Sequence, residues 1–137
     1  MTLYYGFANG VCHHTLHLAL VTYVLYSQSH DLVSSRGVFL GPTTNNIVEY
    51  HLVIGLLIEA SSHGVDHIIV YLDSQLMVSQ LNHVYSICNP VLLRLFRIVH
   101  FLEQSFKYIT YQHVPRYFNS IVDSLANYIL DWHITHS

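Results

Sequence analysis

Charged residues are scarce in this chain of 137 residues, because only 9% of them are Asp, Glu, Lys or Arg. Eight residues are acidic and five are basic, which gives a formal net charge of −3 when histidine is neutral. The 12 histidines add positive charge only below a pH of about 6.5. Nucleic-acid-binding domains usually carry a basic face, so this composition predicts weak and strongly salt-dependent binding to any nucleic acid.

The chain also has few cysteines and no long apolar runs. The two cysteines, Cys12 and Cys88, are not spaced as metal ligands, and we interpret them as free thiols in a reducing compartment. Apolar runs such as residues 52–58 are far shorter than the roughly 18–20 residues of a membrane helix, and the amino-terminal residues lack the basic segment of a signal peptide. We therefore expect an intracellular protein, cytoplasmic or nuclear, without membrane contact.

Apolar residues, in contrast, make up 52% of the chain, with only 6 Gly and 3 Pro. This composition excludes disorder and provides enough apolar surface for a sizeable core. The length predicts one domain over residues 1–137.

Residue patterns predict the secondary structure along the chain. β-branched and aromatic runs predict strands at residues 2–8, 16–26, 36–40, 67–73 and 107–114. Helical spacing and capping residues predict helices from Thr43 or Thr44 to 62, over 74–81, from Pro90 after an Asn89 cap, and over 119–132. The order βββαβααβα predicts an α/β fold, a five-stranded mixed sheet flanked by helices.

Three carboxylates stand where this element order could bring them together. Asp73 ends a central strand, where open α/β sheets place their ligands, while Glu49 and Asp123 lie in the first turns of two helices. Each has a plain explanation alone, as a helix-surface acid, a turn residue or a partner of a helix dipole. Together they would repel one another unless a divalent cation neutralised them, and Mg²⁺ prefers such oxygen ligands.

Three motifs carry a resemblance to a known family. They are Thr44-Asn45-Asn46-x-x-Glu49-Tyr50, Asp73-Ser74-Gln75-Leu76, and His113-Val114-Pro115-Arg116-x-x-Asn119-x-x-x-Asp123. The chain resembles the ribonuclease H family over nearly its whole length, in the reverse-transcriptase-like type of plant long-terminal-repeat retroelement polyproteins. The resemblance implies a ribonuclease H-like fold in which four carboxylates hold two Mg²⁺ (or Mn²⁺) ions that hydrolyse the RNA strand of RNA/DNA hybrids.

The resemblance also assigns roles to residues. Glu49, Asp73 and Asp123 match the second, third and fourth carboxylates, as catalytic residues and metal ligands. The substrate-binding positions that it implies are Asn45, Asn46 and Gln75, which would contact the minor groove of an RNA/DNA hybrid, and Arg116. For Arg116 a phosphate contact and a solvated loop arginine remain equal alternatives.

The first family carboxylate is missing. The family pattern resembles Tyr-Phe-Asp-Gly-Ala, and aligning its Ala with Ala8 puts Gly6 in place of the Asp and Phe7 in place of the Gly. The segment that replaces the following glycine-rich turn, residues 11–15, is expected to be a turn. Either a remnant site binds one ion and cleaves slowly, or the domain is a catalytically silent interaction module. On this alignment Gly6→Asp is expected to increase Mg²⁺-dependent cleavage.

Two other patterns have alternative explanations. Cys12-His13-His14-x-x-His17 is either a metal site or, as we prefer, a solvated His-rich turn. The stripe Leu92, Leu95, Phe96, Val99 and Leu102 is either core packing, which we prefer, or a groove for a partner. The high apolar content leaves a homodimer or a protein partner open.

Overall fold

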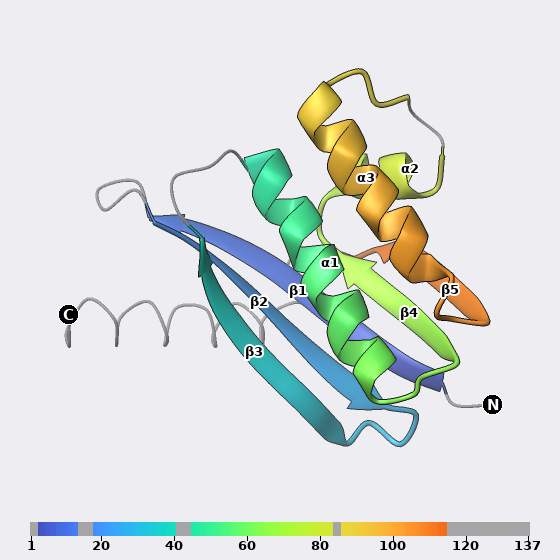
Figure 1. Ribbon diagram of the computed structural model, residues 1–137. Coiled ribbons are helices and arrows are strands. Elements are labelled where there is room, and N and C mark those ends of the chain that lie inside the picture. Colours follow the sequence, from blue (N-terminus) through green and yellow to red (C-terminus); the bar gives the residue numbers. More distant parts are fainter. Residues whose placement is uncertain (1–2, 14–17, 41–44, 84–85, 115–137) are drawn as a thin grey trace.

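The computed structural model describes residues 3–13, 18–40, 45–83 and 86–114, and within them only the backbone of 9–13, 18–21, 38–40 and 45. The described strands are β1 (Leu3–His13), β2 (Leu18–Ser27), β3 (Leu32–Leu40), β4 (His67–Leu72) and β5 (Tyr108–His113). They form a sheet in the order β3-β2-β1-β4-β5 (Figure 1). β1, β2 and β3 are antiparallel neighbours, whereas β4 runs parallel to both β1 and β5. This mixed sheet confirms the predicted fold class.

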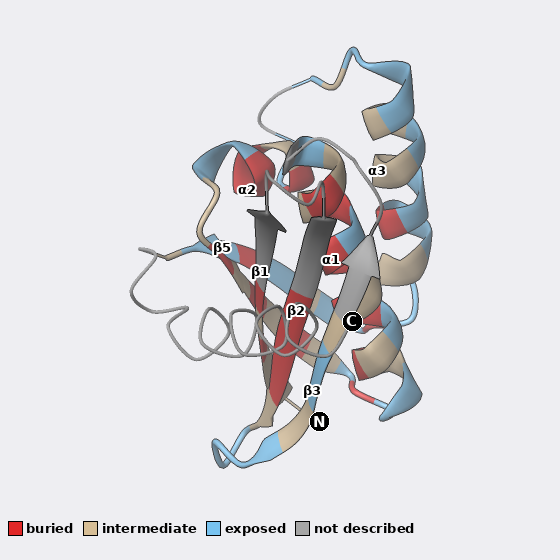
Figure 2. Cartoon of the chain, turned by 90° about the vertical axis from the view of Figure 1, so that its left-hand side faces the viewer, coloured by how far each residue is buried: buried red, intermediate tan, exposed pale blue. Residues whose placement is uncertain are grey.

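The described helices are α1 (Asn45–Ser62), α2 (Gln75–Leu81) and α3 (Pro90–Glu103). Figure 2 shows that α1 and α3 lie on the same side of the sheet. α1 packs on β1 and β2 and also contacts α3. No helix among the described residues is long and apolar enough to cross a membrane.

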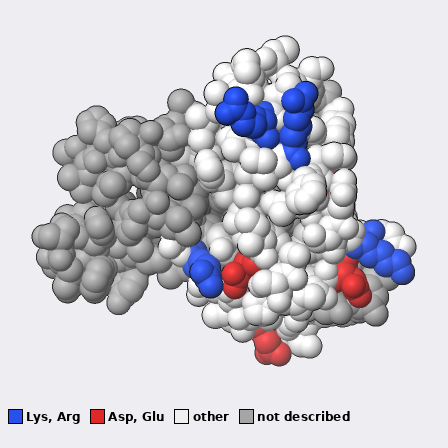
Figure 3. Space-filling view, in the orientation of Figure 1, with Lys and Arg blue, Asp and Glu red and all other residues white. Residues whose placement is uncertain are grey.

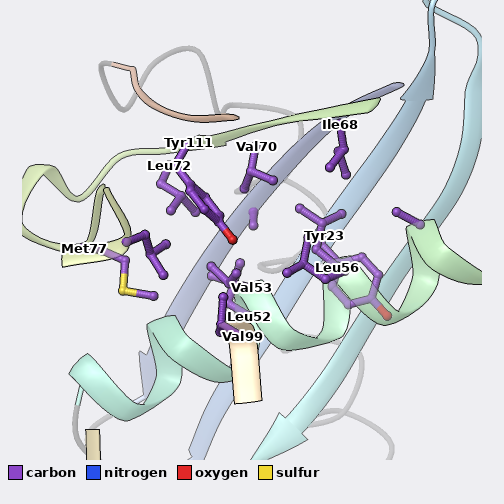
Figure 4. Close-up of a cluster of buried hydrophobic side chains, with 14 of the residues drawn as sticks. Tyr23, Leu52, Val53, Leu56, Ile68, Val70, Leu72, Met77, Val99 and Tyr111 are labelled. Atoms are coloured by element: carbon purple, nitrogen blue, oxygen red, sulfur yellow. The ribbon is translucent and has the colours of Figure 1, made fainter. Parts of the chain in front are cut away.

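The hydrophobic core lies between the sheet and α1. Along β4 the side chains alternate, so that Ile68, Val70 and Leu72 are buried while the residues between them are half-buried. In Figure 4 Val53 and Leu56 of α1 point toward these β4 side chains. Both are fully buried, and the packing fixes the position of α1 on the sheet.

The stripe on α3 belongs to the same core. Val99 is 1% exposed, and the other residues of the stripe pack half-buried against the core cluster. Core packing is therefore the explanation that the structure supports for the stripe.

Local signals fixed several helix ends as expected. Asn89 caps α3, since its Oδ1 accepts hydrogen bonds from the N–H groups of Val91 (2.9 Å) and Leu92 (3.2 Å). Gly64, just after α1, has φ of +69°, a conformation that glycine adopts without a steric penalty.

Two strand predictions were too short, and the predicted turn after β1 was partly wrong. β1 continues five residues beyond Ala8, and β3 begins at Leu32 rather than at Arg36. In the ladder with β2, Cys12 pairs with Ala19 and His13 with Leu18. Regular pairing with a long neighbouring strand thus overrides the local sequence. His14, His17 and the helix predicted at 119–132 lie outside the described residues.

Candidate carboxylate site

Asp73 and Ser74 form the junction between β4 and α2. Asp73 directly follows the last residue of β4, and both it and Ser74 are half-buried. Ser74 is the N-cap of α2, because its Oγ accepts a hydrogen bond from the N–H of Met77 at 3.2 Å. The cap makes the chain turn directly from strand to helix, which holds Asp73 at the end of the sheet.

Glu49 approaches this junction from the second turn of α1. Burial raises the pKa of the Glu49 carboxyl, the negative charge of Asp73 raises it further, and a hydrogen bond with Ser74 lowers it. These interactions place the two carboxylates and Ser74 in one cluster. Two half-buried carboxylates with no cation between them repel each other, and a bound divalent cation would remove that repulsion.

A partly buried hydrogen bond joins α1 to the last turn of α2. Tyr50, next to Glu49, is 0% exposed, and its hydroxyl donates to Oε1 of Gln80 at 2.9 Å. Burial, and then the charge of Glu49, raises the pKa of Tyr50 to about 12, so the hydroxyl remains a donor at neutral pH. This contact ties the second turn of α1, which carries Glu49, to α2.

The other predicted site residues lie at helix starts or outside the described residues. Asn45 is the first residue of α1, and Asn46 follows it with an exposed side chain. Gln75, the first residue of α2, is exposed and donates from Nε2 to Oγ of Ser79 at 3.2 Å. Two predicted residues, Arg116 and Asp123, lie outside the described residues. Where the structure is described, no cluster of three or more His, Cys, Asp or Glu side chains could hold a metal ion.

Gly6 lies away from this cluster, inside the core. It pairs with Val70 of β4, three residues before Asp73, which corresponds to about 10 Å along a strand. A Cβ added at Gly6 would come within 2.6 Å of Cδ2 of Leu56, a fully buried side chain. A carboxylate at Gly6 would therefore point into the packed layer beneath α1, and this geometry argues against Gly6 as the missing site position.

The register between β1 and β4 indicates which position of β1 does reach the end of β4. The paired residues advance together along the two parallel strands, from Leu3 with His67 to Phe7 with Tyr71. β1 continues in regular pairing with β2, where Asn9 pairs with Thr22. The last pair of this ladder is Phe7 with Tyr71, and extending the same register by two residues would bring the backbone of Asn9 level with Asp73, which directly follows β4. The sequence signal for this position is Asn9-Gly10, which has the glycine that follows the Asp in the family pattern.

Comparisons with known proteins agree with the architecture. A family model described as reverse transcriptase-like matches residues 7–129. A ribonuclease HI of Halobacterium salinarum is 36% identical over 113 residues, which are 82% of this chain and 57% of that protein. The bifunctional protein Rv2228c of Mycobacterium tuberculosis is 33% identical over 109 residues, 79% of this chain and 30% of that protein. The chain thus spans only part of these curated relatives.

Several solved structures resemble this chain over nearly the whole length of both chains. The crystal structure of RNase H1 from Halobacterium salinarum superimposes with a TM-score of 0.87 at 32% identity, covering 94% of this chain and 98% of that one. The N-terminal RNase H domain of Rv2228c gives a TM-score of 0.88 at 28% identity, covering 98% of both chains. LC11-RNase H1, solved in complex with an RNA/DNA hybrid, shares the fold with a TM-score of 0.86 at 24% identity, covering 96% and 99%.

Proposed function

Because this chain belongs to the reverse transcriptase-like family and has the ribonuclease H fold, we propose that it binds RNA/DNA hybrids and retains only weak two-metal hydrolysis of the RNA strand. The observation that carries the proposal is the meeting of Glu49 and Asp73 at the start of α2. The hybrid seen with LC11-RNase H1, on the same fold, supports the choice of substrate.

The carboxylate pair fits a hard divalent ion. Glu49 and Asp73 supply anionic oxygens, Asp123 would add a third, and Mg²⁺ or Mn²⁺ bound there would activate water and stabilise the leaving oxygen. Ser74 orients Glu49 through its hydrogen bond, and Tyr50 holds α1 against α2. The amides of Asn46 and Gln75, exposed at the starts of α1 and α2, can donate to 2′-hydroxyl groups in the minor groove.

The weakness of the proposed chemistry comes from β1. We assign the first carboxylate position to Asn9 rather than to Gly6, because the strand register, extended by two residues, would bring Asn9 level with Asp73. An Asn side chain has nearly the shape of Asp but carries no negative charge, so a metal ion held there loses one charged ligand. Because Asn9 is neutral, the carboxylates of this cluster repel one another less in the metal-free protein than they would with an Asp at position 9.

A catalytically silent binding module is the second candidate, and the neutral Asn9 favours it. The two candidates share hybrid binding but differ in cleavage. The retroelement origin, a homodimer and a protein partner stay predictions.

Cleavage of an end-labelled RNA/DNA hybrid in Mg²⁺ or Mn²⁺, measured together with binding in EDTA, tests the proposal. We expect binding in EDTA and slow cleavage with metal, which Asp73→Asn abolishes while binding persists. Binding without any metal-dependent cleavage would establish the silent module. A protein that binds hybrid no better than it binds a neutral polymer would contradict both candidates.

A further inference from the structure

Two arginines on α3 stand out in a chain with few basic residues. Arg94 and Arg97 are the Lys and Arg residues of α3, and both side chains are exposed. In Figure 3 two neighbouring groups of blue atoms lie on the upper part of this face with no red atoms beside them, whereas the other blue groups lie lower, next to red atoms. Residues three apart on a helix are neighbours on its surface, about 5–6 Å apart at Cβ, so the two guanidinium groups form one cationic patch.

The other described cations are engaged elsewhere. Arg36 pairs with Glu59 at 3.3 Å, and Nζ of Lys107 lies 5.9 Å from the ring centroid of Tyr108. Among the described residues no ion pair joins Arg94 or Arg97 to an acid. Glu103, the acid of α3, instead accepts a hydrogen bond from the hydroxyl of Tyr111 at 2.7 Å. Within the described part of the chain, the two guanidinium groups therefore have no acidic partner and can take an external anion.

The patch lies at the end of the molecule that holds the carboxylate cluster. α1 and α3 both begin at this end, close to α2 (Figure 1). The ring of His83, just after α2, meets Phe96 of α3 edge to face with the centroids 5.3 Å apart. This contact joins the segment after α2 to the half-buried side of α3, while Arg94 and Arg97 project from the exposed side of the same helix.

We propose that Arg94 and Arg97 bind backbone phosphates of a nucleic-acid duplex whose scissile strand lies at the carboxylate cluster. The inference rests on the proposed hybrid binding. A duplex carries one phosphate for about every 1.7 Å of its axis, so a duplex that crosses the cluster and continues past α2 offers phosphates to both side chains. Charge complementarity favours this anionic occupant, since both arginines are cationic and the acid of α3, Glu103, is engaged by Tyr111.

The salt dependence of hybrid binding tests the inference. The affinity of the intact protein for an RNA/DNA hybrid is measured in EDTA at several salt concentrations for Arg94→Gln, Arg97→Gln and their double variant. Lys107→Gln is the matched control, because it removes one equal charge from an exposed side chain away from the patch. Each phosphate contact contributes about 0.9 to the slope of log K against log salt in duplex DNA, so each arginine variant should lower the slope by about 0.9 and the double variant by twice that.

The results separate the two proposals. If the parent binds hybrid and all single variants, Lys107→Gln included, show the same slope, the patch is a solvated helix face and this inference alone fails. If the parent does not bind hybrid, the proposed function fails and the inference fails with it. A smaller salt dependence of hybrid affinity that is seen only in the arginine variants supports both the proposed function and this inference.

Discussion

Glu49 of α1 and Asp73 at the end of β4 are electrostatic neighbours, although they lie 24 positions apart in the chain. Burial raises the pKa of the Glu49 carboxyl, and the Asp73 charge raises it further. The protein thus keeps two carboxylates close enough for the charge of one to disfavour ionisation of the other. Such an arrangement is expected at a functional site, where local stability is given up for binding.

The raised pKa of Glu49 predicts how stability depends on pH. A carboxyl whose folded pKa lies above its unfolded value of 4.5 binds more protons in the native state, so stability decreases as pH rises through that interval. In EDTA at pH 7, Glu49→Gln should therefore unfold at a higher urea concentration than the parent, and the difference should shrink below pH 4.5. A variant less stable than the parent at pH 7 would show that the pair is not repulsive.

A methyl group at Gly6 should destabilise the protein. The added Cβ would lie 2.6 Å from Cδ2 of Leu56, which is fully buried. Overpacking of this kind costs about 1–3 kcal/mol, so Gly6→Ala should lower the urea midpoint by a corresponding amount. The matched measurement is the same substitution in a Leu56→Ala background, where the clash is removed and the penalty should largely disappear. Equal penalties in both backgrounds would mean that Gly6 does not face Leu56.

The hydrogen bond between Ser34 and Glu59 should stabilise the contact of β3 with α1. Oγ of Ser34 donates to Oε1 of Glu59 at 2.5 Å, and Arg36 pairs with the other oxygen. The hydrogen bond from Ser34 is the largest cause that lowers the pKa of Glu59. Its contribution is thus present above the unfolded pKa of about 4.5 and is lost as pH falls through the folded pKa.

Ser34→Ala should therefore destabilise the protein by about 1.5–3 kcal/mol at pH 7, as for hydrogen bonds to charged groups. The loss should become smaller as pH falls through the folded pKa of Glu59, which lies below 4.5. Ser35→Ala, on the neighbouring exposed position, is the control and should change stability little. Similar losses for the two serine variants would assign the effect to the strand backbone rather than to Glu59.

Much of the fold followed from local patterns. Asn89-Pro90, Gly64 and the β-branched run before Asp73 are signals that act within a few residues, and the elements that they predicted are present. The ends of β1 and β3 were misjudged because pairing with β2, a tertiary interaction, extends both strands. The pairing of Glu49 with Asp73 also followed from the motifs, since both residues lie in strongly matching segments.

The position on β1 that we propose for the first carboxylate differs from the position that the motif alignment gave. Aligning a short motif on Ala8 chose Gly6, a shift of three residues from Asn9. A motif does not tell which residue of β1 lies beside the end of β4, because that relation depends on the register between strands. The register places Gly6 beside Val70, and the added Cβ contact with Leu56 gives the physical reason why a carboxylate does not fit there.

Binding of Mg²⁺, measured by isothermal titration calorimetry on the parent, Asn9→Asp and Gly6→Asp, tests the central claim most directly. A carboxylate beside Asp73 adds a charged ligand, so Asn9→Asp should bind Mg²⁺ at least about tenfold more tightly than the parent, a difference of about 1.4 kcal/mol. Asp73→Asn in the same background should remove the gain, and Gly6→Asp should show none. The assignment of Asn9 to the site would be contradicted if Gly6→Asp bound Mg²⁺ more tightly than the parent, or if Asn9→Asp did not.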